Sequence, residues 1–315
     1  MKIIGNHSDI LEILLPDGGR YGVDTLEQAY DFCRKVADSH YENFPVGSII
    51  IPKEYRKHFY SVYVFSRVAD DIADELTDYP AEYRVSLLNN LLNLISGFDY
   101  SGLSKKNPLA YALTATIAEK QIPFSPFEKL IKAFVTDSEF IQPIDMDYNI
   151  EYCKYSANPV GELVLRIFDN YDNTTSKFSD AICTGLQLVN FWQDVSTDYR
   201  KGRIYIPTNL LNKYEINDLF DKKAISEPKL KELLKEIYVF TENFFIFGNN
   251  LVKHIKNNRL KFEVILTLNG GLKVLTKCKA LGTGILQVRP QITKFDIFSL
   301  LYKSIIDYLT YKWKR

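Results

Sequence analysis

The sequence predicts an all-α protein, and three of its features carry that prediction. Apolar residues recur mostly at spacings of three and four, the period of a helix with one buried face. Most prolines fall between such segments, where they mark helix boundaries. Strand signals are thin, because only "VGSIII" and "RIYIP" have the composition of strands, and both are short and isolated. We therefore expect one all-α domain over residues 1–315, with a helical core.

Prolines separate the expected helices in chain order. Pro52, Pro80 and Pro228 stand at helix starts, where a missing N–H costs least, and the long helix that begins near 147 is expected to break near Pro159. No repeat or low-complexity segment interrupts the series. The expected helices lie near 24–40, 53–78, 80–97, 106–120, 125–137, 147–171, 174–199, 228–257, 260–282 and 293–313.

Composition excludes several classes of protein. The chain has 39 basic and 39 acidic residues, so it has no net field for generic binding to nucleic acid. No apolar run approaches the roughly 18 residues of a membrane-spanning helix. Asp9 and Glu12 interrupt the N-terminal apolar stretch, which is therefore a poor signal peptide. The cysteines are widely spaced without a CxxC pair, which fits a reducing cytoplasm rather than a zinc site or disulfides: Cys33, Cys153, Cys183 and Cys278.

Three aspartates interrupt the apolar run "YSVYVFSRVADDIADE". Like charges four residues apart on a helix repel by roughly 0.2–0.5 kcal/mol per pair, and Asp is a poor helix former in an interior position. A sequence that accepts both costs needs its carboxylates close together. Steps of three and four place five side chains on one helix face: Tyr63, Arg67, Asp70, Asp71 and Asp74.

A second acidic helix occurs in "LQLVNFWQDVSTDYRKGRIYIP". Gln187, Asn190, Asp194 and Asp198 step by three, four and four onto one face, with apolar neighbours beside them. Two helices that each offer an Asp pair are expected to face one another across the bundle. Taken alone, either pattern is more typical of a solvated helix face, but the repeat between apolar neighbours favours a functional site.

Such a pair of helices would hold a hard cation. Carboxylate oxygens suit Mg²⁺, which keeps several waters and binds substrate phosphates beside one or two carboxylates. A cationic cluster follows the second Asp pair: Arg200, Lys201 and Arg203, with Tyr205 two residues on. Carboxylates, metal and arginines together would neutralise a diphosphate and help it to leave. By itself "RKGR" is more often a surface turn.

These residues resemble the squalene/phytoene synthase family, the head-to-head isoprenoid synthases. The stretch "SRVADDIADE" resembles the family's first Asp-rich motif, and "NFWQDVSTDYRKGRIYIP" resembles its second. Between them, "YCKYSANPVGELVL" is similar to a segment that lines the prenyl cavity. The resemblance covers about residues 40–290. It implies an isoprenoid synthase fold with helices around a central apolar cavity, using prenyl diphosphates and two or three Mg²⁺ ions.

The resemblance also implies a role for each matching residue. The implied metal ligands are Asp70, Asp71, Asp74, Asp194 and Asp198. The implied catalytic residues are Tyr63, Tyr152, Asn190 and, by our own hypothesis, Glu42. The implied substrate and diphosphate contacts are His40, Phe44, Arg67, Gln187, Arg203, Tyr205, Ala157, Val160 and Gly161. Without the resemblance, Tyr152 would be interpreted as a core tyrosine. Ala157, Val160 and Gly161 would be interpreted as residues that only pack one helix against another.

Departures from the family pattern point to one branch. Glu42 in "HYENFPV" stands where condensing members carry Lys, Gln193 replaces their Arg, and Thr197 replaces their Glu. The family's Lys and Arg side chains are thus both missing, which argues against a site that binds two prenyl diphosphates at once. The pattern resembles the bacterial hydroxysqualene synthases of squalene and hopanoid biosynthesis, carbon–oxygen lyases that ionise presqualene diphosphate and capture the rearranged cation with water. Glu42, with its neighbours, is a candidate to position that water, or an exposed loop carboxylate.

That branch implies two partner enzymes, a presqualene diphosphate synthase that hands over the substrate and an oxidoreductase that forms squalene. No nicotinamide site is expected, because no GxGxxG follows a strand. The alternatives are a synthase that condenses two farnesyl or geranylgeranyl diphosphates and a non-catalytic scaffold. The last helix has an apolar stripe, for which packing on the core is favoured over peripheral contact with the inner membrane face: Phe295, Phe298, Leu301, Ile305, Leu309 and Trp313.

Overall fold

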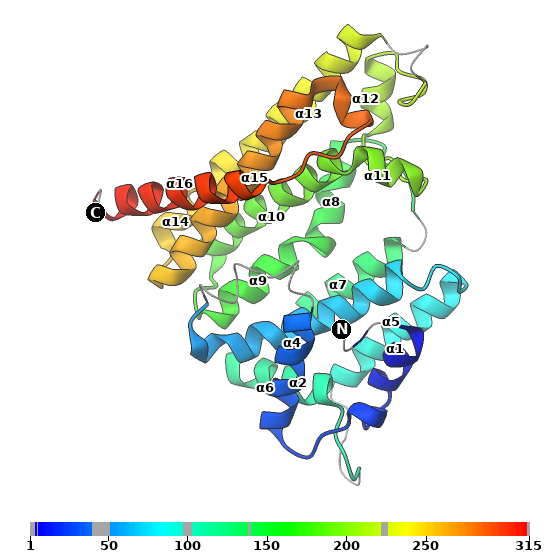
Figure 1. The fold of residues 1–315 in the computed structure, drawn as a ribbon, viewed down its shortest axis with the longest axis vertical. Helices are drawn as coiled ribbons and strands as arrows, with labels where there is room; N and C mark the ends of the chain where they lie inside the picture. The colour runs from blue at the N-terminus through cyan, green and yellow to red at the C-terminus, as the bar shows by residue number, and fades with distance from the viewer. Residues whose placement is uncertain are drawn as a thin grey trace. The chain divides into compact units, whose positions relative to one another are not determined.

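A computed structural model describes residues 4, 6–39, 51–96, 103–137, 140–221 and 226–313. These residues form helices and no strand, apart from an isolated antiparallel bridge between Val23 and Lys106, so the all-α prediction is confirmed (Figure 1). The α-helices are α1 (His7–Ile13), α2 (Leu26–Ser39), α4 (Lys53–Asp74), α5 (Ala81–Ile95), α6 (Pro108–Lys120), α7 (Ser125–Asp137), α8 (Met146–Ser156), α9 (Asn158–Ile167), α10 (Asn173–Gln193), α11 (Val195–Arg200), α12 (Thr208–Lys213), α13 (Glu227–Gly248), α14 (Leu251–His254), α15 (Asn258–Leu281) and α16 (Lys294–Trp313), with 3₁₀ turns η1 (Gly19–Tyr21) and η3 (Gly282–Leu286).

Prolines mark the helix starts as expected. Pro52 and Pro80 are the N-caps of α4 and α5, and α6 begins with Pro108. The expected break near Pro159 occurs two residues earlier, because α8 ends at Ser156 and Ala157 is its C-cap. Pro159 instead lies in the first turn of α9, where no intrahelical hydrogen bond needs its missing N–H.

The contacts within the chain divide it into two compact units. The first comprises Met1–Glu139 and Glu162–Tyr171, and the second comprises Phe140–Gly161 and Asp172–Arg315. Each unit is described by itself below. The prediction of one domain over residues 1–315 stays a prediction.

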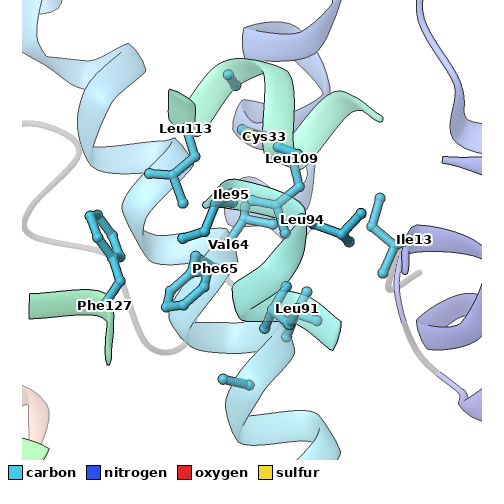
Figure 2. Close-up of a cluster of buried hydrophobic side chains, with 14 of the residues drawn as sticks. Ile13, Cys33, Val64, Phe65, Leu91, Leu94, Ile95, Leu109, Leu113 and Phe127 are labelled. Carbon is cyan, nitrogen blue, oxygen red and sulfur yellow. The ribbon is translucent and has the colours of Figure 1, made fainter. Parts of the chain in front are cut away.

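In the first unit α4 is the central helix, in contact with α2, α5, α6 and α7. Its apolar face points into a cluster that these neighbours close (Figure 2). Phe65 of α4 meets Phe127 of α7 edge to face, with ring centroids 5.2 Å apart. Val64, Leu91 and Leu113 complete the packing, and all five side chains are fully buried. This burial fixes the rotation of α4 about its axis, so its polar face points away from the core.

In the second unit α10, α13 and α15 lie side by side (Figure 1). Gly185 of α10 and Gly271 of α15 both border Phe245 of α13, and a Cβ on Gly271 would come within 2.7 Å of that ring. Glycine is therefore required for this close approach. Trp192 of α10 is fully buried and donates its indole N–H to the hydroxyl of Thr241 at 2.8 Å. These contacts hold the C-terminal end of α10, where the second Asp motif begins.

None of the described helices combines the length and the apolar composition needed to cross a membrane. The sequence-based preference for core packing of the last helix is wrong for four residues of α16, which are exposed, while Leu301 is half-buried: Phe295, Phe298, Ile305 and Leu309.

Candidate functional site

The first Asp motif lies on the polar face of α4, in the first unit. Val64, Val68 and Ile72 are fully buried on the opposite side. Asp74 is exposed, and Tyr63, Arg67 and Asp70 are half-buried, as the spacing of three and four predicts. Asp71 differs, because its side chain turns inward and is buried.

Arg67 neutralises part of this cluster. Its guanidinium donates to Asp70 at 2.9 Å and to Asp71, and it lies 3.8 Å from Glu75. The residues are three, four and eight positions apart, so one α-helical face brings them together. Burial lowers the pKa of Arg67, but the hydrogen bond and charge of Asp71 outweigh burial and raise it. Arg67 thus stays charged and fixed among the carboxylates.

Several carboxylates act on Asp70 at this end of α4. Asp71, Asp74 and Glu75 act electrostatically on Asp70, while the guanidinium of Arg67 pairs with Asp70 and Asp71. Burial raises the pKa of Asp70, the other three carboxylates raise it further, and Arg67 opposes them. A divalent cation would relieve this repulsion, so the donor set of this face fits Mg²⁺.

The second Asp motif lies in the second unit and spans a helix break. The expected single helix over 174–199 is wrong in this respect, because α10 ends at Gln193 and Asp194 is its C-cap. The register nevertheless continues, since the N–H of Asp194 donates to Asn190 at 2.9 Å and the N–H of Asp198 donates to Asp194 at 2.8 Å. Asn190, Asp194 and Asp198 therefore keep their spacing, with Asn190 exposed and both aspartates half-buried.

Arg289 binds the carboxylate of Asp194. Its Nε donates to Oδ1 and its Nη2 to Oδ2, the latter at 3.3 Å, in a bidentate arrangement. This hydrogen bond raises the pKa of Arg289, burial opposes it, and Asp198 adds to the increase. Sequence reasoning missed Arg289, because it lies 95 residues from Asp194 and outside both motifs. The one sign of Arg289 in the sequence is a basic residue next to Pro290, in the short connection before the last helix.

Gln193 and Thr197, the two departures in the second motif, both have structural partners. The side chain of Gln193 is buried and donates to the carbonyl of Pro290 at 2.7 Å. It therefore anchors the segment that carries Arg289. The hydroxyl of Thr197 donates to the carbonyl of Asp194 at 2.8 Å, across the helix break.

Aromatic rings gather next to the second motif. Tyr205 stacks on Phe191 of α10 with centroids 3.9 Å apart and an interplanar angle of 8°. Tyr152 of α8 lies 5.9 Å from the Phe191 ring and 6.5 Å from the Tyr205 ring. Asn149 donates to the carbonyl of Tyr205 at 3.0 Å and so fixes this segment on α8. Two predicted site residues, Tyr152 and Tyr205, are thus brought together in the second unit. Arg203 lies in the same segment, and its N–H donates to the carbonyl of Asp198 at 2.9 Å.

Ala157, Val160 and Gly161, which are predicted to line a prenyl cavity, do not share one environment. A Cβ on Gly161 would come within 2.3 Å of the Ser179 hydroxyl and 2.7 Å of the Cys183 sulfur, so Gly161 allows α9 to approach α10 closely. Ala157 is the C-cap of α8, and Val160 is exposed. Their role as walls of a prenyl cavity stays a prediction.

Several predicted features lie beyond these two clusters. His40, Tyr41, Glu42, Asn43 and Phe44 fall outside the described residues. In the described part of the chain, no three His, Cys, Asp or Glu side chains already form a metal-binding group.

The two Asp motifs lie in different units, so their facing arrangement stays a prediction. A cavity of about 400 Å³ between α13, α15 and α16 contains none of the predicted site residues.

Comparison with known proteins identifies the relatives of this chain. The sequence model for squalene/phytoene synthase matches residues 27–296. A hydroxysqualene synthase from Rhodopseudomonas palustris is 36% identical over 229 residues, which are 71% of this chain and 74% of that protein. A phytoene synthase from Mycobacterium tuberculosis is 27% identical, over 73% of this chain and 75% of that protein. The crystal structure of the squalene synthase HpnC from Alicyclobacillus acidocaldarius matches with a TM-score of 0.71 and 32% identity, over 82% of this chain and 95% of that one.

Proposed function

The chain belongs to the squalene/phytoene synthase family, and from that membership we propose that it converts presqualene diphosphate and water to hydroxysqualene and diphosphate, with Mg²⁺. Three relatives named hydroxysqualene synthase support this reaction, at 36%, 34% and 32% identity. The observation that carries the proposal is the side chain of Gln193. It is neutral, buried and bonded to a backbone carbonyl, so it supplies no cation to a second diphosphate.

Magnesium fits the residues on each motif. Asp70 and Asp74 on α4, and Asp194 and Asp198 at the end of α10, would hold the ions, with Asp71 and Asn190 beside them. The repulsion that Asp71, Asp74 and Glu75 exert on Asp70 supports this assignment. When bound, Mg²⁺ supplies positive charge that stabilises the departing diphosphate.

The chain's own cations bind the diphosphate. Arg67 and Arg203, with Tyr205 and Gln187, orient its oxygens. The carbon–oxygen bond to the diphosphate breaks, and its electron pair leaves on oxygen. Arg67 is already held in place by Asp70 and Asp71, so it loses little conformational entropy when it binds substrate.

The cyclopropylcarbinyl cation that remains is sheltered by aromatic rings. The faces of Tyr152, Tyr205 and Phe191 interact favourably with positive charge. Tyr63 is proposed to lie beside the reacting carbons. Ala157, Val160 and Gly161, with His40 and Phe44, contribute to substrate binding. Exclusion of bulk water protects the cation while it rearranges.

A single water then ends the reaction. Its oxygen bonds to the rearranged carbocation, and a proton is released, so the product is an alcohol. Glu42, together with Tyr41 and Asn43, is proposed to position this water. No reduction occurs, and no nicotinamide is needed. The substrate would come from a presqualene diphosphate synthase, and an oxidoreductase would consume the alcohol, in the cytoplasm.

A second candidate is a condensing synthase that joins two prenyl diphosphates. It is favoured by the similarity to phytoene synthases and to the squalene synthase HpnC. A non-catalytic scaffold is less favoured, because the chain keeps both Asp pairs, Asp70 with Asp74 and Asp194 with Asp198.

A product assay distinguishes these functions. Purified protein with Mg²⁺ and no nicotinamide is offered farnesyl diphosphate and presqualene diphosphate separately, and the extracted lipids are identified by mass. Hydroxysqualene from presqualene diphosphate, with farnesyl diphosphate untouched, supports the proposal. Consumption of farnesyl diphosphate would establish the condensing synthase instead, and inertness toward both substrates would favour the scaffold.

A further inference from the structure

The chain turns back on itself directly after the second Asp motif. The helix α11 ends at Arg200, and Gly202 has a φ of +74°, a left-handed conformation that glycine adopts without steric cost. The N–H of Gly202 donates to the carbonyl of Tyr199, and the N–H of Arg203 donates to the carbonyl of Asp198, both at 2.9 Å. These two hydrogen bonds form a Schellman motif, which returns Arg203 to the level of Asp198.

The two positions that this turn brings together carry opposite charges. In a Schellman motif the second residue after the helix cap commonly makes a hydrophobic contact with the third-last residue of the helix. Here Arg203 and Asp198 occupy these two positions, and both line a crevice with Tyr205. The placement of the Arg203 guanidinium relative to the Asp198 carboxylate therefore depends on how firmly the turn is held.

Phe220, from a later segment of the same unit, packs against this turn. Its ring stacks on that of Tyr199 with centroids 3.5 Å apart and an interplanar angle of 12°. The same ring lines the crevice that contains Asp198 and Arg203. Leu219, the residue before Phe220, is only 1% exposed, so its burial anchors the segment that carries the ring. One side chain thus contacts both the turn and the crevice beside it.

We propose that Phe220 is a positioning residue for the diphosphate, which acts on Arg203 by holding Tyr199 in place. The inference rests on the proposed function, in which Arg203 binds diphosphate and Asp198 binds Mg²⁺. Movement of the turn would separate the two stacked ring faces, which costs free energy. The ring also covers part of the crevice, so water screens the charges there less and the attraction of Arg203 for an anion is stronger.

Binding of inorganic diphosphate to the full chain, with Mg²⁺ and without prenyl substrate, tests the proposal by isothermal titration calorimetry. Phe220→Leu keeps an apolar side chain but removes the ring, and it should weaken diphosphate binding by about 3- to 10-fold. Phe220→Tyr keeps the ring and should bind like the unsubstituted protein. The matched control is Phe247→Leu on α13, whose ring lies 5.1 Å from that of Phe178 in the same unit, and it should leave binding unchanged. Circular dichroism confirms that each variant is folded at the temperature of the titration.

Combination with Arg203→Ala separates positioning from packing. If Phe220 acts through Arg203, Phe220→Leu should have no further effect on diphosphate binding in a chain that already carries Arg203→Ala. Additive losses in the double variant would overturn the proposal, and so would equal binding by Phe220→Leu and the unsubstituted protein. Either result would leave the proposed function intact. Failure of the folded, unsubstituted protein to bind diphosphate would instead contradict the proposed function, and the role of Phe220 with it.

Discussion

Arg289 holds both carboxylate oxygens of Asp194 across 95 residues of sequence. It does so because Gln193, the residue before Asp194, anchors the carbonyl of Pro290, the residue after Arg289. Two adjacent contacts thus fix the segment before α16 against the second Asp motif. A cation that binds Asp194 must compete with the guanidinium of Arg289.

Removal of that guanidinium should make metal binding to the second motif tighter. We predict that Arg289→Ala raises the affinity for Mn²⁺, used as a spectroscopic substitute for Mg²⁺, by about 3- to 10-fold, from the coupling of a partly exposed ion pair. Electron paramagnetic resonance of free Mn²⁺ measures it without substrate. Arg34→Ala, an exposed arginine of α2 that also pairs with aspartates, is the control. An unchanged or weaker affinity in Arg289→Ala would remove Asp194 from the metal site.

Gln193 should contribute to stability through its buried hydrogen bond. We expect Gln193→Ala to lower the free energy of unfolding by about 1–3 kcal/mol, because it leaves the carbonyl of Pro290 without this donor. Urea denaturation measures the change. Gln187→Ala, at a half-buried position of the same helix, is the matched control and should change stability less. Equal effects of both substitutions would argue against the anchor.

The ionised carboxylate of Asp70 should lower the stability of the folded protein, although Mg²⁺-dependent turnover needs it. Burial and neighbouring carboxylates raise its pKa in the folded protein, so the ionised form costs free energy once the pH exceeds the unfolded pKa. Asp70→Asn removes this cost, and the variant should melt at a higher temperature than the unsubstituted protein at pH 8, with the difference lost in acid. Its Mg²⁺-dependent turnover should fall by about 100-fold or more.

Glu54→Gln, in the first turn of α4, is the control for both measurements and should leave turnover unchanged. If Asp70→Asn were less stable than the unsubstituted protein at pH 8, the assigned repulsion would be wrong.

Glu263 of α15 should make the second unit less stable as the pH rises. Burial raises its pKa to about 7, and its Oε2 atom has no hydrogen-bond partner among the described residues. At a pH between the pKa of Glu263 in the unfolded chain and about 7, only the unfolded chain releases this proton, so the free energy of unfolding falls as the pH rises through that range. Above that range the full cost of the buried, ionised carboxylate is present. Glu263→Gln should restore about 2–3 kcal/mol at pH 8 and little at pH 4, by urea denaturation. A pH-independent effect would contradict this.

Local features of the sequence predicted much of the fold. The spacing of three and four on α4 placed Val64 and Val68 inward and Asp70 outward, and prolines marked the starts of α4, α5 and α6. These are properties of a single helix, and its periodicity and end residues determine them.

Long-range contacts explain what local features missed. Arg289 approaches Asp194 only because α10, α15 and the segment before α16 come together, and no local pattern encodes that contact. For α16, periodicity revealed an apolar stripe but not its direction. Lys273 and Lys277, from a different helix, pair with Asp296 and turn the stripe outward.

Incorporation of oxygen from solvent tests the central claim most directly. Presqualene diphosphate is converted by the protein with Mg²⁺ in H₂¹⁸O, and both the lipid product and the released diphosphate are analysed by mass. Capture of a carbocation by water predicts one ¹⁸O atom in hydroxysqualene and none in the diphosphate. An unlabelled alcohol, label in the released phosphate, or a hydrocarbon product would contradict water capture and would require a different function for this chain.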